Sequence, residues 1–166
     1  FIYENHVYAL SNGERYYIIN IEDPKNPYEV GMFEIEKEGQ SIHDVWIENG
    51  IAYSSNWRDG VYLVDVGGGS VGGSPSNPVA FGNYSYDSGA HHATYPFQSK
   101  STGKFYTVLG DEIFPKGVNS KGPSETAGFI HFVDFTDLND PKEVARYEIP
   151  SHGSHNYWIE DDILYV

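Results

Sequence analysis

One five-residue phrase is written three times along this chain, and it constrains the fold more than any other feature. The copies are FIYEN at residues 1–5, VWIEN at 45–49 and YWIED at 157–161. Each copy leads into a short apolar segment typical of a β-strand. A phrase that returns at intervals of tens of residues indicates repeated structural units, and each unit leaves a face that only its neighbour can cover. The sequence therefore predicts a stacked or circular repeat architecture.

A second phrase combines a strand with a turn. IINIEDPKNP at residues 18–27 aligns with FVDFTDLNDP at 132–141, and the shorter copy LVDV at 63–66 is followed by the insertion GGGSVGGS at 67–74. Val, Ile and Phe suit a half-buried strand, whereas Asp, Asn and Pro favour a turn. Each unit is therefore expected to contain a strand that ends abruptly.

A third phrase follows each of these turns, and it completes a set of four strands per unit. Its copies lie at residues 28–35, 79–84 and 143–149. In the middle unit we expect strands at residues 41–47, 51–55, 61–66 and 79–84. Apolar and polar residues roughly alternate in these segments, as in antiparallel sheet, and no useful stretch of helical periodicity is present.

Four-stranded antiparallel units that repeat about an axis are the blades of a β-propeller. We therefore predict an all-β chain that forms part of a single propeller domain of about three blades. The approximate units are residues 1–40, 41–88 and 89–151, and residues 152–166 begin another blade. The alternative is a β-sandwich, but a sandwich does not require the same phrase in every unit.

The two ends of the sequence match the interior of a unit. Residues 1–5 align with 45–49, and residues 157–166 align with the first two strands of the middle unit. Propellers close with roughly four to eight blades. We therefore expect a fragment of a longer propeller, with exposed sheet edges that would pair with another protein or a second copy of the chain.

The composition excludes some partners. The formal net charge is −14, from 10 basic and 24 acidic residues, so phosphates would be repelled and nucleic acid is not an expected partner. An acidic surface instead favours solubility or cation binding. No apolar run is long enough to span a membrane. The chain has no cysteine, which leaves the redox compartment open.

Histidines recur where the first strand of a unit begins. His43, the pair His91 and His92, and His155 all take this position. In a propeller the first strands surround the central channel, so equivalent strand starts lie on one rim. We therefore expect these imidazoles to face a common space, whereas His6 and His131 lie off the pattern on strands or surfaces.

Antiparallel pairing returns the end of each second strand to the same rim. Imidazoles and carboxylates placed together can hold a divalent metal ion. The candidate metal ligands are His43, Asp44, His91, His92, Asp111, Glu112 and His155. Further candidates at the rim or against a ligand are Asn56, Trp57, Arg58, His152 and Asn156. The structural alternative is that the histidines only bond to loop carbonyls and keep the blades in register.

The strand and turn phrases resemble a known family. LVDV at residues 63–66 and FVDFTDLNDP at 132–141 are similar to the LVIVD repeat of prokaryotic secreted or surface-anchored β-propellers, including the choice-of-anchor B group. His43–Trp46, His91–Glu112 and Ser154–Trp158 resemble that group's pattern in the same order. The resemblance implies an extracellular or cell-surface location. A looser similarity, in architecture and histidine placement alone, exists to selenium-binding proteins of the methanethiol oxidase type.

Two functions from different classes remain open. The first is a noncatalytic extracellular binding or assembly module, with a metal or small ligand at its rim and partner surfaces on the loops at 67–74 and 114–126. The second is a metal-dependent enzyme in which Glu112 or Asp44 acts as general base near a metal-bound water. We favour the first, because the sequence identifies neither a pocket that excludes water nor a base of tuned pKa.

Overall fold

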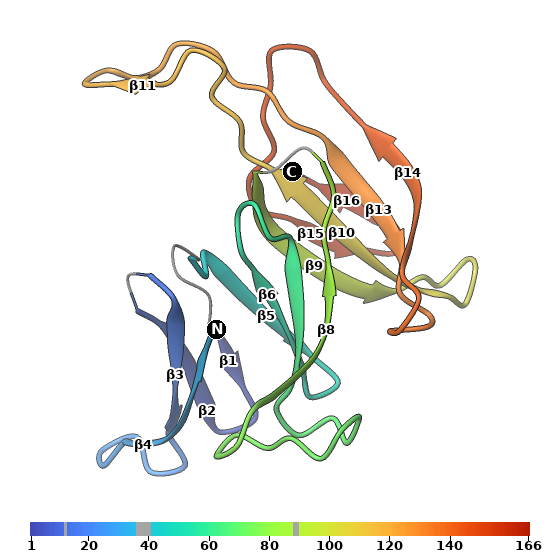
Figure 1. Ribbon diagram of the computed structural model, residues 1–166. Coiled ribbons are helices and arrows are strands. Elements are labelled where there is room, and N and C mark those ends of the chain that lie inside the picture. The colour runs from blue at the N-terminus through green and yellow to red at the C-terminus, as the bar shows by residue number, and fades with distance from the viewer. Residues whose placement is uncertain (12, 36–40, 88–89) are drawn as a thin grey trace.

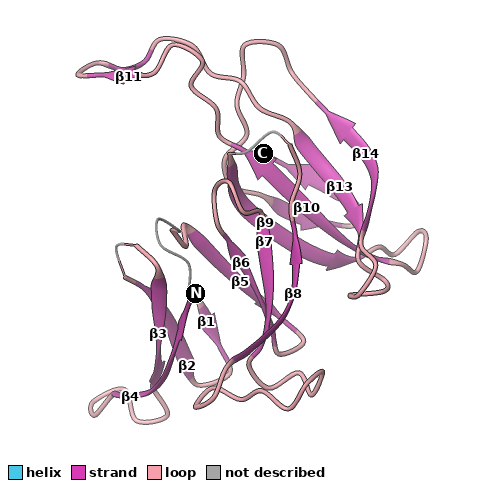
Figure 2. Cartoon of the chain, viewed as in Figure 1, coloured by secondary structure: helices cyan, strands magenta, loops and turns pink. Residues whose placement is uncertain are grey.

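The computed structural model describes residues 1–11, 13–35, 41–87 and 90–166. These residues form strands, turns and loops, with no helix among them (Figure 2). Three four-stranded antiparallel sheets follow one another along the described chain (Figure 1). The prediction of an all-β chain with blade-like sheets is confirmed. Of the three expected unit boundaries, those after residues 40 and 88 fall at residues outside the described ranges, and the one after residue 151 falls in a described turn.

In the first two sheets the spatial order of the strands is their order in the chain. The first sheet contains β1 (Ile2–Tyr3), β2 (His6–Leu10), β3 (Arg15–Asn20) and β4 (Tyr28–Glu34). The second contains β5 (Asp44–Glu48), β6 (Ile51–Ser55), β7 (Val61–Asp65) and β8 (Val79–Tyr84). The first strand of the second sheet begins at Asp44, three residues later than expected, and the Ile42 N–H before it donates to the Gly13 carbonyl (2.8 Å).

The third sheet carries an insertion. It contains β9 (His91–Gln98), β10 (Phe105–Asp111), β13 (Ile130–Asp134) and β14 (Lys142–Tyr147). Between β10 and β13 the chain forms a small hairpin, β11 (Val118–Asn119) and β12 (Gly122–Pro123), which projects from the sheets (Figure 1). A two-stranded sheet follows, made of β15 (Trp158–Glu160) and β16 (Ile163–Tyr165). Among the described residues, no helix is long and apolar enough to cross a membrane.

The segments that align in sequence also share local structure. The last residue of the third strand is Asn20, Asp65 or Asp134, and its side-chain oxygen accepts the backbone N–H two residues on, at 2.9, 3.0 and 2.9 Å. The pairing of the third and fourth strands shifts register just before each of these residues. The Asp or Asn in the phrase is therefore what ends the strand and starts the turn.

Apolar side chains fill the spaces between successive sheets. The first space contains Tyr16, Ile18, Val45, Ile47 and Val64. The second contains Tyr53, Leu63, Leu109, Val133 and Phe135. The third contains Tyr95, Val108, Ile130 and Tyr157, with Trp46 and Leu164 against them. Each fully buried side chain of this size contributes roughly 1.5–3 kcal/mol to folding, so the sheets hold one another face to face.

Candidate metal centre

Three side chains from three strand ends come together at one end of the sheets. His43 lies just before β5, His92 is the second residue of β9, and Glu112 follows β10. One ligand atom from each of them, a ring nitrogen or a carboxylate oxygen, lies within 4.8 Å of the others. Among the described residues, these three side chains form a group that could hold a metal ion.

Backbone hydrogen bonds hold each of these strand ends to its neighbour in the same sheet. The His43 N–H donates to the Ser55 carbonyl (2.8 Å), and the Glu112 N–H donates to the Ala90 carbonyl (2.9 Å). The β9–β10 ladder pairs Gly110 with Ala93 but Asp111 with His91, so His92 is the extra residue of a β-bulge. A bulge redirects the side chain that it carries. This bulge turns His92 toward His43 and away from the side taken by His91.

The imidazoles are packed against one another. The ring centroids of His43 and His92 are 4.3 Å apart, and those of His92 and His155 are 4.0 Å apart. The Glu112 carboxylate lies 3.5 Å from His92 Nε2 and 4.0 Å from His155 Nε2. His155 is the most exposed member, with 64% of its side chain accessible. Three imidazoles and one carboxylate therefore border the same space.

The protonation state of His92 favours metal binding. Its Nδ1 lies 3.2 Å from the His155 backbone carbonyl. A carbonyl oxygen can only accept, so Nδ1 carries the proton and Nε2 keeps its lone pair. Burial, together with the neighbouring His43 and His155, lowers the pKa of His92 to about 4. Burial also lowers the pKa of His43.

A hollow of about 450 Å³ opens beside these side chains. It is lined by His43, Asp44, His92, Glu112, His155 and Asn156. Asp44 is the first residue of β5, and burial raises the pKa of its carboxyl group. The hollow therefore combines three imidazoles, two carboxyl groups and an amide.

His91 and Asp111 face the other way. His91 is fully buried, with Nδ1 2.8 Å from the Tyr86 hydroxyl and Nε2 2.9 Å from the Thr94 hydroxyl. The Asp111 carboxylate lies 3.1 Å from Nε2 of the buried His131. The sequence grouped these two residues with His92 and Glu112, but the bulge and the alternation of the strand place them on opposite faces.

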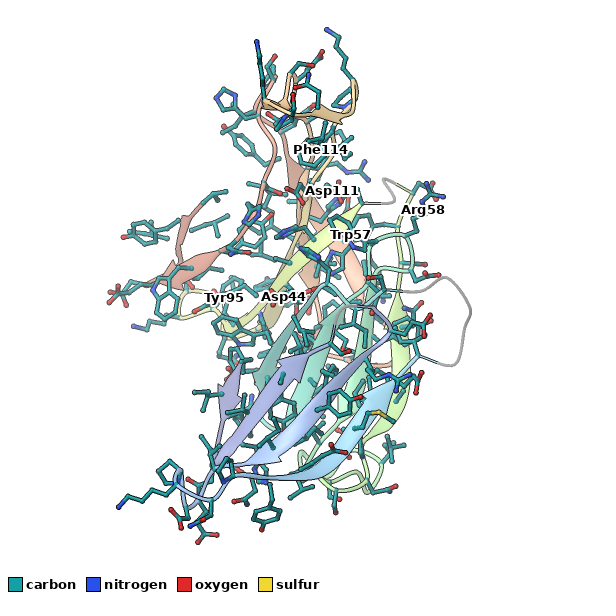
Figure 3. All side chains as sticks on the ribbon, turned by 90° about the vertical axis from the view of Figure 1, so that its left-hand side faces the viewer. Asp44, Trp57, Arg58, Tyr95, Asp111 and Phe114 are labelled. Atoms are coloured by element: carbon teal, nitrogen blue, oxygen red, sulfur yellow. The ribbon has the colours of Figure 1, made fainter. Side chains whose placement is uncertain are left out.

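The remaining rim candidates divide into two groups. Trp57 and Asn156 lie at the site: the Trp57 indole packs 4.3 Å from the His43 ring, and Asn156 lines the hollow. In the view of Figure 3, Asp44, Trp57 and Asp111 lie in the middle of the molecule, below the projecting loops, and Arg58 lies farther out toward the edge. Asn56 is buried as part of a turn, and its side-chain amide donates to the Ser54 carbonyl (2.6 Å). Exposed His152 lines a different hollow, beside Ile130 and Tyr147.

Sequence reasoning missed a second polar cluster behind the site. His131 on β13 is 1% exposed; its Nδ1 lies 2.8 Å from Glu143, and its Nε2 contacts Asp111. Burial alone would lower the pKa of His131, but hydrogen bonds with Asp111 and Glu143 outweigh it and raise that pKa. The only signal in the sequence is a histidine inside the apolar segment IHFV, which does not reveal its partners.

Comparison of the chain with models of protein families, with curated proteins and with solved structures found no match. The resemblance to LVIVD-repeat propellers therefore stays a prediction. What the geometry itself provides is a cluster of imidazoles and a carboxylate on the ends of blade-like sheets.

Proposed function

We propose that this chain is part of a propeller-type binding module that holds one divalent transition-metal ion at its strand ends. The ligands are His43, His92 and Glu112, with His155 as the fourth. The observation that carries the proposal is the approach of three ligand atoms to within 4.8 Å of one another. Ligand atoms around a tetrahedral zinc ion stand roughly 3–4 Å apart. Small side-chain rotations would therefore complete the coordination.

The ligand types favour a transition metal over calcium or magnesium. Imidazole nitrogen suits zinc, copper, iron and nickel, whereas calcium and magnesium prefer oxygen alone. Burial keeps His43 and His92 neutral near pH 7, which leaves lone pairs for a metal. The net charge of −14 raises the local concentration of cations.

The partner surface of this module is the hairpin between β10 and β13. Its base adjoins Glu112, it projects from the sheets (Figure 1), and Val118 on it is 61% exposed. The loop after β7 suits this role less well, because Asp65 accepts four backbone N–H groups and fixes its shape. Following the LVIVD resemblance, we place the module outside the cell or on its surface.

Metal stoichiometry tests this proposal. After equilibrium dialysis against Zn²⁺ or Ni²⁺, elemental analysis should find one ion per chain. His43→Ala, His92→Ala and Glu112→Ala should each lose the ion. His152→Ala should retain it, because His152 is an exposed histidine that lines another hollow. Equal stoichiometry in the wild type and a triple variant of the three ligands would contradict the proposal.

A metal-dependent hydrolase is the second candidate, and Asp44 is the observation that favours it. Asp44 lines the hollow without belonging to the three-residue ligand group, and burial raises the pKa of its carboxyl group. A carboxylate in that position suits a general base for metal-bound water. Metal-dependent hydrolysis of ester or phosphoester probes that is lost in Asp44→Asn, with the metal retained, would favour this candidate over binding alone.

A further inference from the structure

Trp57 has the most unusual backbone near the candidate metal centre. Its φ is +32°, in the left-handed region that large side chains rarely adopt. The other described non-glycine residues with positive φ are all polar, and none is aromatic: Glu4, Asn49, Ser151, Asp161 and Asp162. A bulky residue in this conformation is strained, so the surrounding structure must hold it there.

The turn after β6 supplies that restraint. Buried Asn56 donates its side-chain amide to the Ser54 carbonyl (2.6 Å), and its backbone N–H donates to the Gly60 carbonyl (2.8 Å). The Asp59 N–H donates in turn to the Asn56 carbonyl (2.7 Å). Trp57 lies inside this closed turn and has little freedom to relax.

Trp57 contacts both histidines of the ligand group. Its backbone carbonyl accepts the His91 N–H (2.9 Å), which fixes the strand directly before His92. Its indole lies 4.3 Å from the His43 ring and meets the His92 ring edge-on at 5.8 Å. One residue therefore restrains the two imidazoles that come from different sheets.

We infer that Trp57 is a positioning residue for the metal centre, an inference that rests on the proposed metal site. The indole packs against the His43 ring and limits its rotation, so the ring nitrogens stay directed toward His92 and Glu112. Ligands that are already oriented lose less conformational freedom when the metal binds. The strained backbone is retained because it places the indole there.

Substitutions that relieve the strain separate this role from simple packing. Glycine and asparagine both tolerate positive φ, whereas phenylalanine keeps an aromatic ring on the strained backbone. In Trp57→Asn and Trp57→Gly we expect the thermal midpoint of the metal-free protein to be unchanged or higher. The Kd for Zn²⁺ should rise by about tenfold to one-hundredfold, the usual effect of losing a residue that orients ligands. Trp57→Phe should retain most of the affinity.

Trp158→Phe is the matched control, because Trp158 is an exposed tryptophan on β15, outside the three-residue ligand group. It should leave the Kd unchanged. A lower midpoint with an unchanged Kd in Trp57→Asn would show that Trp57 only packs, and would overturn the inference while the metal site stands. Failure of the wild type to bind Zn²⁺ would overturn the metal site and this inference together.

A measurement without metal tests the contact between the two rings itself. The indole should shift the His43 ring-proton resonances upfield in the wild type, and Trp57→Asn should abolish that shift while Trp158→Phe preserves it. Identical His43 resonances in the wild type and Trp57→Asn would also overturn the inference, because the indole would then not cover the imidazole in solution.

Discussion

Two histidine clusters lie back to back at the end of the second and third sheets, and they differ in the partners of their imidazole nitrogens. In the outer cluster, His43, His92 and His155 pack around one carboxylate beside an open hollow. In the inner cluster, His131 is enclosed and lies between the carboxylates of Asp111 and Glu143. The imidazoles of the outer cluster border a hollow with space for a ligand, whereas each ring nitrogen of His131 already has a carboxylate partner.

This difference shows that burial and partners, more than residue type, decide what a histidine does. The pKa of buried His131 is raised because two carboxylates hydrogen-bond to it, although burial opposes the shift. The pKa of His92 is lowered because burial dominates there, and the neighbouring His43 and His155 act in the same direction. We therefore expect the inner cluster to support stability and the outer cluster to support binding.

The largest effect should come from breaking the inner cluster. Asp111→Ala removes the buried carboxylate at Nε2 of His131 and leaves Glu143 at its Nδ1. Removal of one partner of a buried pair costs about 3–5 kcal/mol. Chemical denaturation should show this loss in the free energy of unfolding. A loss below about 1 kcal/mol would place this pair with weak surface ion pairs and would remove the contrast between the clusters.

The two clusters should respond to pH in opposite directions. His92 titrates near pH 4 in the folded chain and near 6.5 when unfolded, so its contribution is lost as the pH falls between these values. The loss is of order 3 kcal/mol. His131 has a raised pKa, so its contribution is complete below about pH 6.5 and is lost as the pH rises through its folded pKa.

Denaturation curves at several pH values check both directions. His92→Gln should flatten the acidic side of the stability profile, and His131→Gln should flatten the alkaline side. If both variants flatten the same side, the two histidines do not differ in the way that their surroundings indicate.

Metal removal should affect the outer cluster alone. With free Zn²⁺ at one hundred times its Kd, binding should stabilise the fold by about 2.7 kcal/mol, and a chelator should reverse this. Calorimetric midpoints with and without chelator measure the effect. If the clusters are independent, the chelator should lower the thermal midpoint of Asp111→Asn by the same amount as that of the wild type. A chelator that leaves the midpoint of the wild type unchanged would contradict the metal site.

The smallest effect should come from truncating an outer ligand in the metal-free protein. His43 is only partly buried, so His43→Ala should change the free energy of unfolding by less than about 1 kcal/mol while abolishing metal binding. Denaturation without metal measures the first quantity, and dialysis measures the second. A large stability loss here would mean that the outer cluster is itself structural.

The strands and turns could be predicted from the sequence because their causes are local. Apolar residues followed by Asp or Asn and then Pro encode a strand and its end, and the structure places β3, β7 and β13 on these phrases. The site could be predicted only in part. Antiparallel pairing implied that the start of β9 and the end of β10 meet, but adjacent residues such as His91 and His92 could not be separated.

The sequence by itself determined four-stranded units and a set of histidines at their strand starts, because strand alternation and turn chemistry act over a few residues. Only the tertiary structure decided which of those histidines share a space. The register shift between Gly110 and Asp111 turns His92 and Glu112 outward and leaves His91 and Asp111 inside. The tertiary packing also brings Trp57 against His43. Such contacts depend on the pairing and packing of distant segments, which no local pattern specifies.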